Sequence, residues 1–188
     1  AILTGWLLDR LWDRAFETVE TTPITLHDEE ERALPGRRVR VASIFNAPPE
    51  EVWAKVTTPA LLSQVAYPLL VFRRQDGAPL PEVWREGEAL HLSLFGLGYI
   101  PLGPHTIEVA RIDAERREIQ SHESGRMAEI WHHTITIDEA QGGLTRYTDI
   151  IDIYAGPLTG AVAAFARVFY RYRQTRWQAV LRERQAKN

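Results

Sequence analysis

The chain has 188 residues, which suits one domain with a sizeable core, with or without an extension. Its formal net charge is −3 at pH 7, so charge predicts no nucleic-acid partner. The absence of cysteine excludes disulfides, thiol nucleophiles and thiolate metal sites. This composition fits a reducing compartment, and we expect a cytoplasmic protein.

The first 36 residues are expected to form a helical extension and a linker. Apolar residues recur at roughly helical spacing through residues 1–18, which predicts an amphipathic helix. The apolar start Ala1–Leu8 is too short for a membrane span, and no basic region precedes it, so it is not typical of a signal peptide. Residues 19–37 are polar and favour a linker or exposed arm. The compact domain is therefore predicted over residues 37–188.

A strand and two short helices are predicted at the start of that domain. Apolar residues alternate along Arg38–Phe45, as in a half-buried strand. Pro48 or Pro49 can begin the first helix, because the missing N–H leaves no bond unmade at that position. Thr58, as the cap, and Pro59 repeat this pattern for the second helix.

The segment from Val83 to Tyr154 is predicted to be mostly strand. Trp84–Leu94 is expected to hold two strands around a turn at Glu86–Glu88. Leu94–Pro104 carries three glycines and two prolines, which favours a loop or a bent strand. Short turns then separate four consecutive strands of an antiparallel meander: His105–Asp113, Glu118–Ser124, Met127–Asp138 and Leu144–Tyr154.

A long C-terminal helix is predicted from Leu158 to about Gln185, with a broad apolar stripe. Basic side chains outnumber the single acid, Glu183, and we expect them to form a solvated face. Binding of phosphate, an acidic partner or anionic lipid is the alternative. The basic residues are Arg167, Arg171, Arg173, Arg176, Arg182, Arg184 and Lys187.

This order of elements predicts an α+β fold. A curved antiparallel sheet of this size has an apolar face that one long helix can cover, with two short helices closing one end. The arrangement leaves an interior cavity, which is the usual place for a small-molecule ligand.

The layout from about residue 38 to 185 resembles the START-like superfamily (SRPBCC or Bet v 1-like), whose members have a helix-grip fold. Phe45–Leu62 is similar to the first strand end and paired helices of that superfamily. Trp131–Leu158 is similar to the last hairpin and helix start of a bacterial branch. Within it, the matching residues are Trp131, His133, Thr145, Asp149 and Pro157, whereas Ile135 and Ile137 depart from the pattern.

The resemblance implies binding of hydrophobic or amphipathic ligands such as lipids, sterols or polyketides between sheet and helix. Some members of the superfamily are aromatase/cyclases or other enzymes, and others are co-chaperones. The fold alone therefore narrows function only loosely.

The last hairpin is predicted to place a polar pair inside the cavity. With a turn at Gln141–Gly143, we expect His133 to lie opposite Asp149. Alternation then puts both side chains on the apolar, helix-facing side, and His132 faces water. A buried imidazole or carboxylate needs a partner. The pair could satisfy itself, contact the polar end of a ligand, or act as a general acid or base.

No metal or cofactor is predicted. His132 and His133 point to opposite faces of their strand and cannot share an ion. We expect His122 to fall near Ala128, about five residues or roughly 16 Å from His133, which is too far for ligation. The glycines of Leu94–Pro104 do not complete a nucleotide-binding pattern, because Pro101 occupies the third glycine position.

The leading hypothesis is a non-enzymatic carrier of a hydrophobic small molecule. An enzyme hypothesis, a cyclase or dehydratase using His133 and Asp149, requires both side chains to open onto the pocket. A third possibility is a protein-interaction module or a homodimer formed through the N-terminal or C-terminal helix. The predicted pocket residues are Trp84, Phe95, Tyr99, Ile107, Val109, Trp131, His133, Tyr147, Asp149, Ile151, Phe165, Phe169 and Tyr172.

Overall fold

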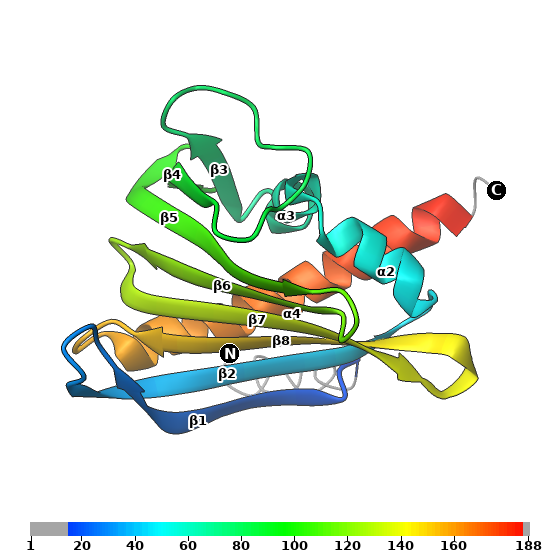
Figure 1. Cartoon of the computed structure of the whole chain (residues 1–188), viewed down its shortest axis with the longest axis horizontal. Coiled ribbons are helices and arrows are strands. Elements are labelled where there is room, and N and C mark those ends of the chain that lie inside the picture. The colour runs from blue at the N-terminus through cyan, green and yellow to red at the C-terminus, as the bar shows by residue number, and fades with distance from the viewer. Residues whose placement is uncertain (1–14, 186–188) are drawn as a thin grey trace, which may run out of the picture.

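The computed structural model describes residues 15–185, in which eight strands form one curved antiparallel sheet (Figure 1). The strand order is β1-β2-β8-β7-β6-β5-β4-β3, so neighbours in sequence are neighbours in the sheet except where β8 lies beside β2. The strands are β1 (Thr18–His27), β2 (Ala33–Phe45), β3 (Leu70–Arg74), β4 (Ala89–Gly96), β5 (Ile100–Asp113), β6 (Glu118–Gly125), β7 (Ala128–Ala140) and β8 (Leu144–Tyr154).

Within residues 15–185, the sheet is joined by the α-helices α2 (Pro49–Val56), α3 (Pro59–Ala66) and α4 (Thr159–Gln185). Both short helices begin at proline, as predicted, although the Thr58 hydroxyl donates to the Lys55 carbonyl instead of capping α3. Figure 1 shows α4 running along the sheet, with α2 and α3 towards its C-terminal half. The helix-grip α+β fold is thus confirmed. No helix within residues 15–185 is long and apolar enough to cross a membrane.

The predicted linker at residues 19–37 is wrong. These residues form β1 and the start of β2, which pair as an antiparallel hairpin with Thr18 opposite Ala42 and His27 opposite Ala33. The strand β1 lies at the sheet edge and is mostly exposed, and it contains Pro23. An edge strand tolerates proline and polar side chains, so its composition is close to that of a loop. Most of the predicted N-terminal helix lies outside the described residues, and Phe16 is not helical.

One further strand prediction is wrong, and one strand was missed. Trp84 and Arg85 lie in an irregular segment, where the Trp84 N–H donates to the Thr57 carbonyl. The region where two strands were predicted therefore contains one strand, β4. The glycine-rich segment Leu94–Pro104 forms the end of β4 and the start of β5 around a tight turn at Leu97–Tyr99. The β4–β5 register shifts between Leu94 and Phe95, which agrees with the bent strand that was one of the two predicted alternatives. The short strand β3, which we did not predict, pairs with β4 at the other sheet edge.

The β7–β8 hairpin has a register two residues away from the predicted one. Its turn, Gln141–Gly143, places Ala140 opposite Leu144, and His133 therefore lies opposite Ile151 instead of Asp149. Because side chains alternate with a period of two, this shift leaves every side chain on its predicted face. His133 and Asp149 share the inner face as diagonal neighbours.

The predicted position of His122 is also wrong. His122 lies directly opposite His132 on the outer face, with ring centroids 4.3 Å apart. The turn after β6 is tight, since Gly125 pairs with Ala128, and β6 therefore runs alongside β7 further than we expected. The inner-face neighbours of His133 and Trp131 on β6 are consequently Ser121 and Glu123.

The C-terminal half of α4 is anchored by an aromatic cluster under α2. Trp177 is 2% exposed, and its ring lies 4.9 Å from that of Tyr147 and 5.5 Å from that of Phe45. Phe45 and Tyr147 stack on each other at 4.9 Å. The cluster holds α4 against β2 and β8.

Replacing Trp177 with alanine should lower the free energy of unfolding by about 3–5 kcal/mol, because a large side chain leaves a cavity in a packed core. Urea denaturation measures this change. The matched control is Val168→Ala on the same helix, where the side chain is 47% exposed and the change should stay within about 0.5 kcal/mol. Equal effects of the two substitutions would contradict the anchoring role.

Candidate functional site

A cavity lies between the inner face of the sheet and α4. The cavity volume is about 90 Å³, several times the roughly 10–15 Å³ that is enough to hold one water. The interior is therefore hollow, as the leading hypothesis requires. Its walls come from α2, α3, β3 to β7 and α4.

Most of the cavity wall is apolar. Leu61 and Leu62 of α3 contribute to it, as do Phe72 of β3 and Leu94 of β4. On the helix, Phe165 and Phe169 stack with ring centroids 5.7 Å apart and an interplanar angle of 10°. These side chains would offer an apolar ligand a hydrophobic surface on several sides.

Polar side chains gather on one part of the wall, where the middle of β5, β6 and β7 faces the middle of α4. Alternation along each strand brings them inward, since Ser121 and His133 are directly paired and Glu123 pairs with Trp131. The polar lining residues in this region are His105, Ser121, Glu123, His133, Tyr170 and Arg173. An otherwise apolar cavity with a few convergent polar groups is typical of a small-molecule site.

Glu123 is held by two neighbours on the cavity wall. One oxygen lies 2.9 Å from His105 Nε2, and the other accepts a hydrogen bond from the Ser121 hydroxyl at 2.9 Å. Burial opposes ionisation, but the hydrogen bond from His105 and the charges of His105 and His133 outweigh it, so the pKa of Glu123 lies below its ordinary value. Glu123 is therefore a carboxylate at neutral pH.

Asp149 is the most completely bonded acid of the site. It is 0% exposed and accepts hydrogen bonds from His133 Nε2 at 2.8 Å, the Tyr147 hydroxyl at 3.2 Å and Gln174 Nε2 at 2.9 Å. Burial would raise the pKa of Asp149, but the bond from His133 and the charge of Arg173 outweigh burial and lower it. Asp149 is thus ionised and fully engaged.

His133 stands between two carboxylates. Its Nε2 bonds Asp149, and its Nδ1 lies 3.8 Å from a Glu123 oxygen. The predicted His133–Asp149 contact exists, but only His133 lines the cavity, and Asp149 lies behind it. An acid–base role for this pair would need a ring nitrogen free to meet the ligand. The geometry instead favours a positioning role for Asp149.

Two buried tyrosines remain neutral phenols. Burial raises the pKa of Tyr147 and that of Tyr170, and the charge of Asp149 raises both further. The Tyr170 hydroxyl accepts a hydrogen bond from Trp131 Nε1 at 3.3 Å, and its ring packs edge-on against His133 at 4.9 Å. Tyr170 thereby joins the helix to the strand that carries His133.

Seven of the thirteen predicted pocket residues line the cavity. They are Trp84, Ile107, Val109, Trp131, His133, Phe165 and Phe169.

The other six predicted pocket residues do not line it. Tyr147, Asp149 and Ile151 face inward but are buried behind the wall by α4. Tyr99 is 74% exposed because it lies at the tip of the β4–β5 hairpin. Phe95 packs beneath the guanidinium of Arg73, and the Tyr172 hydroxyl donates to the Tyr67 carbonyl, so both turn away from the cavity.

Sequence reasoning missed the polar residues of β5 and β6 and one from α4. His105, Ser121 and Glu123 follow the same alternation as His133, but finding them required the β6–β7 register. Arg173 was assigned to a solvated basic face, whereas Arg173 is 7% and Arg171 is 2% exposed. The curved sheet encloses α4 so far that these two arginines, which lie beside the apolar stripe of the helix, are also buried.

Among residues 15–185, no group of three or more histidine, aspartate or glutamate side chains is arranged to hold a metal ion. Two histidines do lie close to Glu123: His105 Nε2 is 2.9 Å from one carboxylate oxygen, and His133 Nδ1 is 3.8 Å from the other.

Comparison with known proteins places the chain in a family. The model of a domain of unknown function, DUF8410, matches residues 43–181, which span the fold from β2 to α4 and contain the whole cavity wall. The chain belongs to the DUF8410 family. No curated protein matches it.

Solved structures similar to this DUF8410 member share its fold at low sequence identity. A protein from Rhodobacter sphaeroides is 17% identical with a TM-score of 0.61, covering 87% of this chain and 99% of its own. Protein CV1439 from Chromobacterium violaceum is 15% identical with a TM-score of 0.60, covering 76% and 95%. The ginseng major latex-like protein 151 from Panax ginseng is 11% identical with a TM-score of 0.53, covering 77% and 96%. These likenesses show the START-like fold, as the sequence predicted.

Asp149→Asn should destabilise this DUF8410 domain by about 3–5 kcal/mol at pH 7, because it removes the charge from a buried, hydrogen-bonded pair. The folded-state pKa of Asp149 is lowered, so its ionised form contributes stability above the ordinary value of 3.8. That contribution disappears as the pH falls through the lower folded value. Urea denaturation from pH 7 down to acid should therefore show the gap between wild type and variant narrowing below about pH 4.

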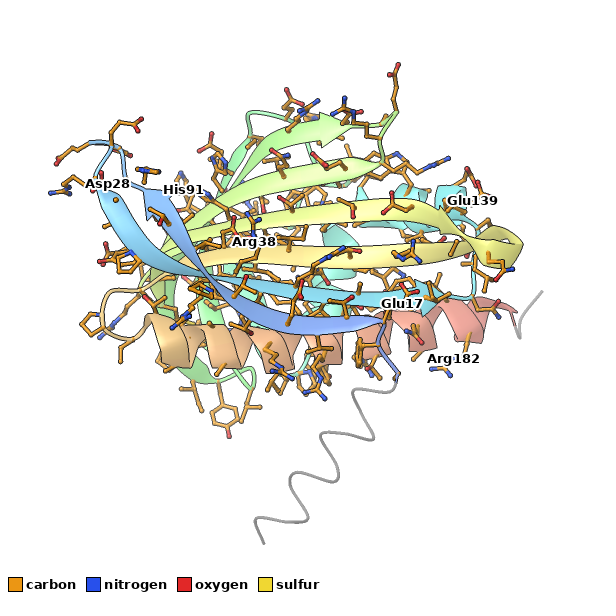
Figure 2. All side chains as sticks on the ribbon, turned by 90° about the horizontal axis from the view of Figure 1, so that it is seen from below. Glu17, Asp28, Arg38, His91, Glu139 and Arg182 are labelled. Atoms are coloured by element: carbon orange, nitrogen blue, oxygen red, sulfur yellow. The ribbon has the colours of Figure 1, made fainter. Side chains whose placement is uncertain are left out.

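The matched control for this substitution is Asp152→Asn on the outer face of the same strand. Asp152 pairs with Arg38, which is 48% exposed and lies over the outer face of the sheet in Figure 2. Its loss should cost about 1 kcal/mol or less. A pH-independent gap for Asp149→Asn would contradict the assignment of an ionised, stabilising carboxylate.

Proposed function

We propose that the protein binds, and carries, a hydrophobic small molecule of lipid-like or polyketide-like character in the cavity between the sheet and α4. The observation that carries this proposal is the hollow interior with largely apolar walls and polar groups on one part only. Hydrophobic burial would supply most of the affinity, and the polar groups would orient the ligand.

Binding without catalysis is the function that the geometry supports best. The cyclase or dehydratase alternative requires His133 and Asp149 to open onto the cavity together, and Asp149 lies outside its lining. The hydrogen bonds around Asp149 also leave it little capacity to exchange protons with a ligand. The interaction-module alternative expects a closed interior, which the cavity disfavours. Homodimer formation through the helices stays a prediction.

A neutral fluorescent probe, 1-aminoanthracene, tests the proposal. The wild-type protein should bind one probe per chain, with enhanced and blue-shifted emission as the probe leaves water. Ala128 lines the cavity and is 5% exposed, so Ala128→Phe should fill part of the space and weaken binding at least about tenfold.

The matched control is Ala164→Phe, which makes the same change on the exposed side of α4 and should leave binding unchanged. Circular dichroism confirms that both variants fold. Equal affinity of wild type and Ala128→Phe would place the probe outside the cavity and contradict the proposal.

A further inference from the structure

Arg173 brings a guanidinium group into the cavity from the middle of α4. The residue is 7% exposed and belongs to the cavity wall. Its guanidinium lies 4.8 Å from the ring centroid of Tyr170 and 5.9 Å from that of Phe169, so aromatic faces support it on the helix side. These contacts hold the cation in place and leave its N–H donors unused.

Within residues 15–185, Arg173 has no hydrogen-bond acceptor and no carboxylate within ion-pair distance. Its Nε in particular is fully buried without a partner. A buried guanidinium carries five N–H donors and no acceptor, so unmade bonds are costly there. The buried guanidinium is therefore available to bind an acceptor group of a ligand.

The acidic groups of the site already have partners. Glu123 is bonded by His105 and Ser121, and Asp149 by His133, Tyr147 and Gln174. Their charges reach Arg173 at longer range, where they outweigh the effect of its burial and raise its pKa. Among the described residues, the ion-pair partners of these two carboxylates are His105 and His133, and not Arg173. The guanidinium therefore has no direct anionic partner on the cavity wall described here.

We infer that the ligand is an amphipathic monocarboxylic acid whose carboxylate pairs with Arg173. This inference rests on the proposed function and specifies the ligand's polar end. The planar guanidinium can bind a carboxylate through two parallel N–H···O bonds, which are strong when water is excluded. A single cation near two carboxylates suits a monoanion, whereas a phosphate dianion would meet the negative charge of Glu123 and Asp149. The apolar body would lie against Phe165, Phe169 and the strand wall.

Calorimetric titration of matched ligands tests the inference. Two pairs share their apolar body and differ in the polar end: decanoate against decanol, and 2-naphthoate against 2-naphthalenemethanol. Wild-type protein should bind at least one acid about tenfold or more tightly than its alcohol, which corresponds to about 1.4 kcal/mol. Arg173→Met keeps the side-chain length and removes the charge, and should abolish this preference while leaving the alcohol's affinity within about threefold.

Two further variants complete the design. Arg173→Lys keeps the charge without the two-pronged geometry and should retain part of the preference. Arg176→Met is the control, because Arg176 is exposed on the same helix and lines no part of the cavity, and it should preserve the full preference.

Failure of the inference can be told apart from failure of the proposed function. If alcohols bind as tightly as acids, or if Arg173→Met retains the acid preference, the carboxylate assignment is overturned and the apolar pocket stands. If neither member of either pair binds and 1-aminoanthracene does not bind either, both proposals are overturned.

Discussion

The buried carboxylate of Asp149 is the contact on which the interior of this protein depends. It accepts hydrogen bonds from β7 through His133 and from α4 through Gln174. Gln174 also donates to the Val41 carbonyl and accepts a bond from the Ser43 hydroxyl at 2.6 Å, so the same network reaches β2. An unpaired buried carboxylate is very unfavourable. The observed rotation of α4 about its axis satisfies all these groups at once, and turning the helix away would break the bonds made by Gln174. The network therefore sets how the helix faces the sheet.

The cavity and its polar region follow from that rotation. With Gln174 directed at the sheet and Trp177 packed beside Tyr147, the preceding turn of the helix presents Tyr170 to His133 and Arg173 to the open interior. The N-terminal part of α4 then contributes Phe165 and Phe169 to an apolar wall. The polar network thus stabilises the fold, and the apolar wall and the unused guanidinium next to it are available to a ligand. This division explains why Asp149 is buried behind the wall instead of lining it.

The sequence predicted the fold better than the site, for physical reasons. Period-two alternation placed His133 and Asp149 on the inner face, and a register error of two residues could not change that result. The edge strand β1 was missed because an exposed strand with Pro23 has the composition of a loop. Placing Glu123 in the cavity required the register of β6 with β7. That register depends on the turn between the two strands, whose position the sequence did not define. Arg173 was assigned to solvent because a basic run usually marks a solvated face, whereas enclosure of α4 by the curved sheet is a tertiary effect.

The most direct test of this account is a two-dimensional ¹H–¹⁵N spectrum recorded while 2-naphthoate is added to the labelled protein. The account predicts that the Arg173 Nε–Hε signal and the backbone amides of Ser121 and Ala128 shift together and saturate at one ligand per chain. Signals from the edge strand β1, which lines no part of the cavity, such as the backbone amides of Glu20 and Thr22, should stay in place. Shifts confined to the outer face or to the hairpin tip at Tyr99, with Arg173 unaffected, would contradict an internal site organised around the guanidinium.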